Sequence, residues 1–383
     1  MKGLRYDLAE TNGGMAVAGK MSRALYLAAV LALAGCDPGS LLSPMHNALP
    51  PEQGFMKGMT EAGYQRNVFL DPQVYASLGQ LRKDGVNWMS LQVAWYQKND
   101  ESDRIFADDK ETPTDASVRR MIAYLGGLGM RVFLDIFINA NHQNAWQATF
   151  QPKDPKAWFR SYDHYLIHYA RLAEADHVSL FAIGDEFDRI DDVPQYEPYW
   201  ARAIADVRQY YHGPITYGAD YPHYQKVTFW KLLDVVGVDA YFPLTTAKDP
   251  TTSELAAAWD RLADRIQTWR MASGLVRKPF VITELGYFSG NGAAANPGDW
   301  TPSAAVNLGL QKRCYLATFQ TIYRRPWLAG LFWFWWANPS NPHWQGGPHD
   351  NGYTPRGKPA QSVLRYYFHL RPGVPMPALG STV

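Results

Sequence analysis

Two apolar stretches of this chain each run into a glutamate: Phe181-Ala-Ile-Gly-Asp-Glu-Phe187 and Phe280-Val-Ile-Thr-Glu-Leu-Gly-Tyr287. Short continuous apolar runs are typical of strands that are buried on both faces, as in a parallel sheet. In a parallel α/β barrel the carboxyl ends of all strands lie on one face. Glu186 and Glu284 are therefore predicted to reach a common cleft although they are far apart in the sequence.

Six further apolar runs bring the predicted strands to eight, covering residues 54–60, 86–95, 131–139, 178–187, 215–221, 235–244, 279–287 and 328–336. Apolar residues at three- and four-residue spacing predict helices between them, over residues 71–83, 116–128, 155–173, 197–211, 253–272 and 304–323. This alternation predicts one α/β domain, a (β/α)8 TIM barrel over residues 53–371. An open doubly wound sheet is the alternative, although no G-x-G-x-x-G loop follows the first strand.

Composition narrows the classes of partner. A chain of 383 residues with 46% hydrophobic content suits one large core. The formal net charge of +1 provides no excess positive potential for a phosphate backbone, so nucleic acid is excluded as a partner. The 14 Trp and 23 Tyr residues suit the apolar faces of sugars, and they suit ordinary core packing equally well.

The N-terminus is predicted to be a signal peptide over residues 1–36, of which residues 1–20 are either an extended basic region or a start-site artefact. An apolar run over residues 24–35 is too short to span a bilayer, and it ends at Cys36 in a sequence that resembles the bacterial lipobox. We therefore expect an exported lipoprotein, anchored to a membrane through lipid on Cys36 and facing the periplasm or the cell exterior; a plain secretory signal is the alternative. Residues 37–52 read as a flexible linker and residues 372–383 as a tail.

Several motifs together resemble glycoside hydrolase family 113, a family of clan A. They are Trp158-Phe-Arg-Ser-Tyr162, Phe181-Ala-Ile-Gly-Asp-Glu186, Asp239-Ala-Tyr-Phe-Pro-Leu244, Ile282-Thr-Glu-Leu-Gly-Tyr287 and Gly352-Tyr-Thr-Pro-Arg-Gly-Lys-Pro359. The resemblance covers residues 53–370 and implies a retaining endo-β-1,4-mannanase, or an enzyme acting on a related β-linked polysaccharide. It also implies that Glu186 is the acid/base and Glu284 the nucleophile. The chemistry fits, because retaining glycosidases use two carboxyl groups about 5 to 5.5 Å apart.

Asp185 departs from the family pattern, which has asparagine before the acid/base, where the amide binds the substrate hydroxyl next to the anomeric carbon. An ionised carboxylate can accept a hydrogen bond from that hydroxyl but cannot donate one, and its charge would raise the pKa of Glu186. The alternative function is therefore a non-catalytic glycan-binding or exopolysaccharide-assembly lipoprotein on the same barrel.

Further substrate contacts are predicted at the strand ends: Tyr241, Trp335, Trp336, Asn139, Asn141, His142, Trp95 and Lys57. The resemblance implies that Tyr241 holds the nucleophile and that Trp336 stacks on the reacting sugar, with Trp335 competing for that role. A core tyrosine and packing tryptophans are the structural alternatives. Lys57 is expected to meet a carboxylate or a sugar hydroxyl, because an unpaired buried amine is costly. Asp135 is expected to pair with Lys57 or Arg131, and we expect a monomer that needs no metal or cofactor.

Overall fold

The computed structural model describes residues 54–140, 146–299, 304–336 and 345–370. The predicted signal peptide, linker and tail, with Cys36, Asn141 and His142, lie outside the described residues. All of the described residues belong to one compact unit, Met45–Val383.

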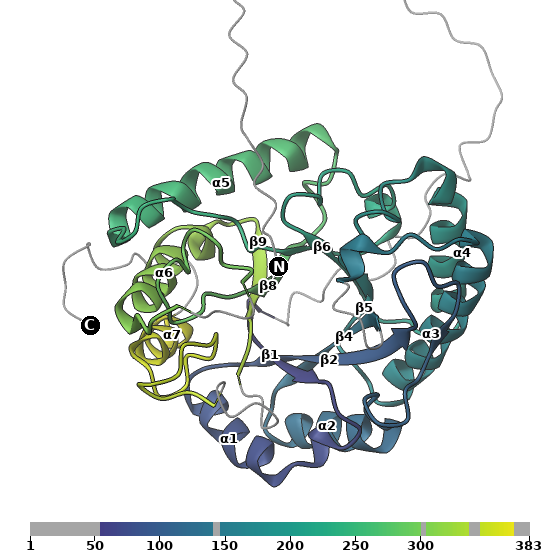
Figure 1. Cartoon of the computed structure of the whole chain (residues 1–383), viewed down its shortest axis with the longest axis horizontal. Coiled ribbons are helices and arrows are strands. Elements are labelled where there is room, and N and C mark those ends of the chain that lie inside the picture. The colour runs from purple at the N-terminus through teal and green to yellow at the C-terminus, as the bar shows by residue number, and fades with distance from the viewer. Residues whose placement is uncertain (1–53, 141–145, 300–303, 337–344, 371–383) are drawn as a thin grey trace, which may run out of the picture. The chain divides into compact units, whose positions relative to one another are not determined.

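Eight parallel strands close into a barrel (Figure 1). They are β1 (Met56–Gly63), β2 (Trp88–Gln97), β4 (Arg131–Ala140), β5 (Leu180–Asp185), β6 (Ile215–Asp220), β7 (Val236–Asp239), β8 (Phe280–Leu285) and β9 (Leu328–Trp333). Closure is complete because β1 pairs with both β2 and β9, and the short strand β3 (Ile105–Phe106) adds an antiparallel edge to β2. The predicted (β/α)8 TIM barrel is confirmed.

Helices surround the barrel (Figure 1): α1 (Pro72–Lys83), α2 (Asp115–Gly127), α3 (Pro155–Ala175), α4 (Glu197–Arg208), α5 (Thr252–Ala272), α6 (Leu308–Gln320) and α7 (Pro359–His369). Short 3-10 turns lie at Val68–Leu70, Gln147–Thr149, Pro194–Tyr196, Trp230–Leu232 and Ile322–Arg324. Helix starts follow local chemistry: the side chains of Asp71, Asp154 and Thr251 each accept a bond from a backbone N–H of the first turn. No helix in the described ranges is long and apolar enough to span a membrane.

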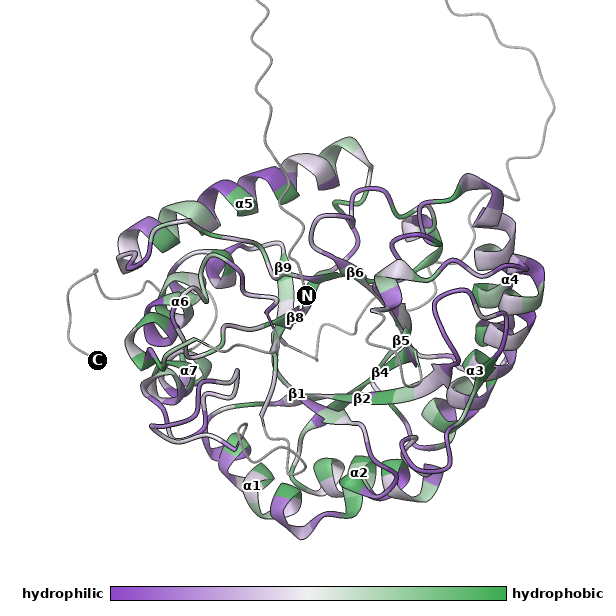
Figure 2. Cartoon of the chain, in the orientation of Figure 1, coloured by the Kyte–Doolittle hydropathy of each residue, from purple (hydrophilic) through white to green (hydrophobic). Residues whose placement is uncertain are grey.

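The apolar core has two parts. The larger lies between the strands and the helices, and β2 and the helices α2 and α3 show green segments in Figure 2. A smaller cluster fills the barrel interior near the amino ends of the strands: Met56, Trp88, Phe133, Leu180, Ala182, Val235, Val281 and Phe332. Because this plug closes one end, polar side chains inside the barrel gather toward the carboxyl ends of the strands.

Candidate active site

Glu284 lies near the end of β8 and is 7% exposed. The Tyr241 hydroxyl donates to Glu284 Oε2 at 2.7 Å, and the Gln92 amide of β2 donates to Glu284 Oε1. Burial and the negative charge of Asp135 raise the pKa of Glu284 to about 8, while the bonds from Tyr241 and Gln92 oppose that rise. The carboxyl group is therefore fixed in orientation from two sides.

Glu186 follows β5 directly and has a left-handed backbone with φ of 49°. Its backbone N–H donates to the carbonyl oxygen of Gly218 on β6 at 2.8 Å. On its carboxyl group, Oε2 accepts from Trp146 Nε1 at 2.5 Å and from Gln147 Nε2 at 3.3 Å. A non-glycine residue with this backbone is uncommon, and such conformations concentrate at functional sites.

Glu186 and Glu284 share one electrostatic environment. Burial first, and then the negative charges of Asp220, Asp239 and Glu284, raise the pKa of Glu186 well above its ordinary value. Asp239 of β7 lies in register with Glu284 on one side and with Asp220 of β6 on the other, so these acids form a row along the carboxyl ends of neighbouring strands. The arrangement provides one carboxyl group that holds a proton strongly, Glu186, and one oriented by two donors, Glu284.

Asp185 points into the same acidic group and is 4% exposed. Its Oδ2 accepts from Gln147 Nε2 at 3.2 Å, and its side chain is hydrogen-bonded to that of Asp239. Burial and the charges of Asp239, Glu186 and Asp135 raise the pKa of Asp185 well above its ordinary value.

Three of the predicted substrate contacts, Trp95, Trp336 and Lys57, have side chains that contact groups other than the barrel acids. Trp95 faces outward against α3, where its Nε1 donates to Tyr169 Oη at 3.0 Å. The indole of Trp336 is fully buried and donates to Ser77 Oγ of α1 at 2.9 Å, so no ring face is available to a sugar. Lys57 lies near the start of β1, where its amine donates to carbonyl oxygens at the end of α7 rather than to a carboxylate or a sugar.

Other predicted contacts lie closer to the acids. The Trp335 ring is 6.1 Å from that of Tyr64, a half-buried tyrosine whose pKa is raised by desolvation and then by the charge of Glu284. Asn139, near the end of β4, hydrogen-bonds the phenol of Tyr96. Trp335 is 2% exposed, so it contacts this region mainly through packing.

Sequence reasoning missed four residues that contact the predicted site: Gln92, Trp146, Gln147 and Asp239. Gln92 is the one that a local pattern could have revealed, since it is a polar residue in the middle of an apolar strand. It also lies 3.4 Å from Asp135 Oδ2, as does Ser90 Oγ, so the expected pairing of Asp135 with Lys57 or Arg131 is wrong.

A group that could hold a metal ion lies beside this region: ligand atoms of Asp188, Asp191 and His223 are all within 4.8 Å of one another. His223 Nε2 is 3.0 Å from Asp191 Oδ1, so this contact joins the segments after β5 and β6.

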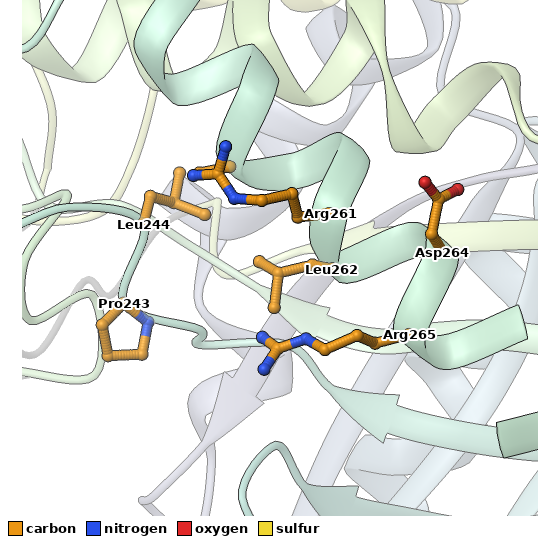
Figure 3. Close-up of a pocket in the computed structure, with 7 residues that line it drawn as sticks. Pro243, Leu244, Arg261, Leu262, Asp264 and Arg265 are labelled. Atoms are coloured by element: carbon orange, nitrogen blue, oxygen red, sulfur yellow. The ribbon is translucent and has the colours of Figure 1, made fainter. Parts of the chain in front are cut away.

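A separate pocket of about 500 Å³ lies against α5 (Figure 3), lined by Pro243, Leu244, Ala258, Arg261, Leu262, Asp264 and Arg265. It contains none of the barrel acids and is therefore not the candidate active site.

Two buried glutamates with raised pKa values lie at the carboxyl ends of β5 and β8 of a (β/α)8 barrel, and together with the family match they define the chain as a glycoside hydrolase. A protein-family model identifies the family within the glycoside hydrolases. It matches residues 60–358, and the chain belongs to Glycoside Hydrolase Family 113. The resemblance inferred from the sequence is thus confirmed.

Solved structures agree. A GH113 β-1,4-mannanase, solved as a complex, is 27% identical, with 82% of this chain and 99% of that chain covered and a TM-score of 0.72. The β-mannanase AaManA from Alicyclobacillus acidocaldarius, in complex with ManMIm, is 26% identical over 82% of this chain and 97% of its own, with a TM-score of 0.72. A Ruminococcus gnavus β-glucuronidase, 12% identical with a TM-score of 0.55 over 82% of this chain and 50% of that one, shares the fold alone. No match was found among curated proteins.

Proposed function

We propose that this chain is a retaining endo-β-1,4-mannanase that works by double displacement, with Glu284 as nucleophile and Glu186 as acid/base. The observation that carries the proposal is the unequal treatment of the two carboxyl groups. Each carboxyl group accepts two hydrogen bonds, but the negative charges around them differ. One charge, that of Asp135, raises the pKa of Glu284 to about 8, whereas three raise the pKa of Glu186 well above its ordinary value and favour its protonated form. Similarity to solved β-mannanases supports mannan as the substrate.

In the first step ionised Glu284 attacks the anomeric carbon, and Glu186 gives its proton to the leaving glycosidic oxygen. The bond from carbon to the leaving oxygen breaks as the bond to the Glu284 oxygen forms. In the second step Glu186, now a carboxylate, takes a proton from water, and the resulting oxygen nucleophile displaces Glu284. Two inversions at one carbon give net retention.

The second candidate is a non-catalytic glycan-binding or exopolysaccharide-assembly lipoprotein. The observation that favours it is Asp185, because a carboxyl group replaces the asparagine that the family pattern places beside the acid/base. Under this alternative the two glutamates bind sugar hydroxyls without breaking a bond.

We further propose that the protein is exported and held at a membrane by lipid on Cys36, acting as a monomer on the periplasmic or cell-surface face. The support is the apolar run over residues 24–35 that ends at this cysteine. Metabolic labelling with a fatty-acid analogue tests it: label should enter the wild-type protein and be absent from Cys36→Ser.

The test of the catalytic proposal is a comparison of Glu186→Ala, Glu284→Ala and Glu197→Ala on β-mannan, cellulose and self-secreted exopolysaccharide. Glu197 is an exposed residue at the start of α4, so its variant is the matched control and should retain wild-type turnover. We expect both site variants to release no product. The wild-type enzyme should give an initial product of β configuration, measured by NMR. Hydrolysis that survives Glu284→Ala would reject the nucleophile assignment, and wild-type binding without turnover would favour the lipoprotein alternative.

A further inference from the structure

Asp185 of β5 and Asp239 of β7 meet across the intervening strand β6, at Gly218. A Cβ atom built on Gly218 would lie 2.5 Å from Asp185 Oδ1 and 2.8 Å from Asp239 Oδ2. Both oxygens therefore approach the same point above the glycine. Gly218 lies in register with Asp185 on one side and Gly237 on the other, so the strand between the two acids presents no side chain at this level.

Few hydrogen-bond donors surround Asp239, so two negative charges on Asp185 and Asp239 would be poorly stabilised. Asp239 is fully buried. The side chains that hydrogen-bond it are those of Asp185 and Thr283, of which only the Thr283 hydroxyl is a neutral donor. Two ionised carboxylates would be acceptors facing each other in a region that excludes water, whereas one added proton turns one of them into a donor.

We propose that Asp185 and Asp239 share a single proton, held between Asp185 Oδ1 and Asp239 Oδ2, and that this acid pair positions Glu186 through Gln147. The inference rests on the proposed function in treating Glu186 as the acid/base. The pair carries one negative charge instead of two and provides a hydrogen-bonded, partly neutral group at the position where the family pattern has an amide.

Gln147 connects the pair to Glu186. Its Nε2 donates to Asp185 Oδ2 at 3.2 Å and to Glu186 Oε2 at 3.3 Å, so one amide group is divided between two carboxyl groups. A fully ionised Asp185 would compete more strongly for that amide and weaken its bond to Glu186. The shared proton thus limits the charge on Asp185 and preserves the donor on the acid/base.

Other titratable groups face the pair, and burial raises the pKa of the pair itself. The charges of Glu186 and Asp135 act on Asp185, and those of Glu284 and Asp188 act on Asp239. Burial and these charges raise the pKa of Asp239 to about 8, which is consistent with a proton that stays in the pair at neutral pH. The largest causes acting on these two acids are burial, negative charges and side-chain hydrogen bonds.

Infrared difference spectroscopy of the full chain at neutral pH tests the proposal without any substrate, because a protonated carboxyl group has its own carbonyl stretch. Wild type is compared with Asp185→Asn, Asp239→Asn and the double variant. We expect the double variant to lose the intensity of one protonated carboxyl group, and each single variant to lose no more than the double variant, because burial lets the remaining acid keep the proton. A double variant that loses the intensity of two protonated carboxyl groups, or of none, would overturn the shared proton.

The matched control is Asp163→Asn on α3, a half-buried acid whose pKa burial raises to about 6. Measured at pH 5, its loss should add to that of the double variant, because Asp163 is protonated independently of the pair. The positioning role has a separate readout: Asp185→Asn and Asp239→Asn should each shift the basic limb of the pH profile of kcat/KM. Loss of kcat without a shift would assign the pair a merely structural role, whereas absence of turnover in wild type would reject the proposed function and leave the infrared result standing.

Discussion

The hydrogen bond from Tyr241 to Glu284 gives the sharpest test of how this site selects its nucleophile. Tyr241→Phe removes the hydroxyl that donates to Glu284 Oε2 at 2.7 Å and keeps the ring. The bond from Gln92 to the other oxygen is retained. Because the lost donor favours the ionised form, the variant should raise the pKa of Glu284.

The size of the effect follows from the bond. A hydrogen bond to a charged group is worth about 1.5–3 kcal/mol, and about 1.4 kcal/mol corresponds to one pKa unit, so the shift should be roughly 1 to 2 units. Wild-type Glu284 has a pKa of about 8. About one tenth of it is then ionised at pH 7, and the variant should lower that fraction, and with it kcat/KM, by roughly 10- to 100-fold.

The assay is the pH profile of kcat/KM on a soluble β-1,4-mannan. The acidic limb should move to higher pH in Tyr241→Phe, and activity should recover in part as the pH rises. Tyr315→Phe is the matched control, because the buried Tyr315 hydroxyl of α6 has no hydrogen-bond partner among the described residues and its ring stacks on Trp333. A uniform loss of activity with an unmoved acidic limb would refute the reasoning.

Three further predictions follow from the same contacts. Trp146→Phe removes the bond that lowers the pKa of Glu186, so the basic limb of kcat/KM should move up by about one unit or less; a downward shift would contradict this. Gly218→Ala places a Cβ against two aspartate oxygens and should lower the free energy of unfolding in urea by about 1–3 kcal/mol, whereas Gly79→Ala, in open space on α1, should raise it by up to about 1 kcal/mol. The folded-state pKa of Glu284 is raised to about 8, so its protonated form contributes stability at low pH that is lost as the pH rises toward 8; Glu284→Gln should flatten that part of the pH dependence of Tm.

The barrel could be predicted because each strand is a short apolar run between helical periodicities. Boundaries were less accurate: the run over residues 235–244 contains only the four-residue strand β7, Val236–Asp239, and α7 lies in a stretch for which no helix was predicted. Strand β7 ends early because the residues after Asp239 leave the sheet to bring Tyr241 to Glu284. That contact is tertiary and leaves no periodic pattern in the sequence.

The side-chain directions of the tryptophans could not be predicted, for a physical reason. Barrel strands are buried on both faces, so a two-residue apolar alternation is missing and the sequence does not distinguish inward from outward positions. On β2 the inward residues include Ser90 and Gln92, which reach Asp135, and the alternation then turns Trp95 toward α3. The prediction for Lys57 differs from the structure for another reason. Lys57 lies near the amino end of β1, whereas the acids lie at the carboxyl ends of the strands.

The barrel mouth contains more acids than the proposed reaction uses, and the negative charges around each glutamate decide which of the two ionises. Burial is the first cause of the raised pKa of Asp185, Asp239 and Glu284 alike, and the next causes are negative charges and side-chain hydrogen bonds. Protons therefore reduce the negative charge of the group, and the proposed shared proton of Asp185 and Asp239 is one of them. Both glutamates accept two hydrogen bonds, but one neighbouring charge, that of Asp135, raises the pKa of Glu284, whereas three raise that of Glu186. Glu284 is therefore the glutamate better able to give up its proton.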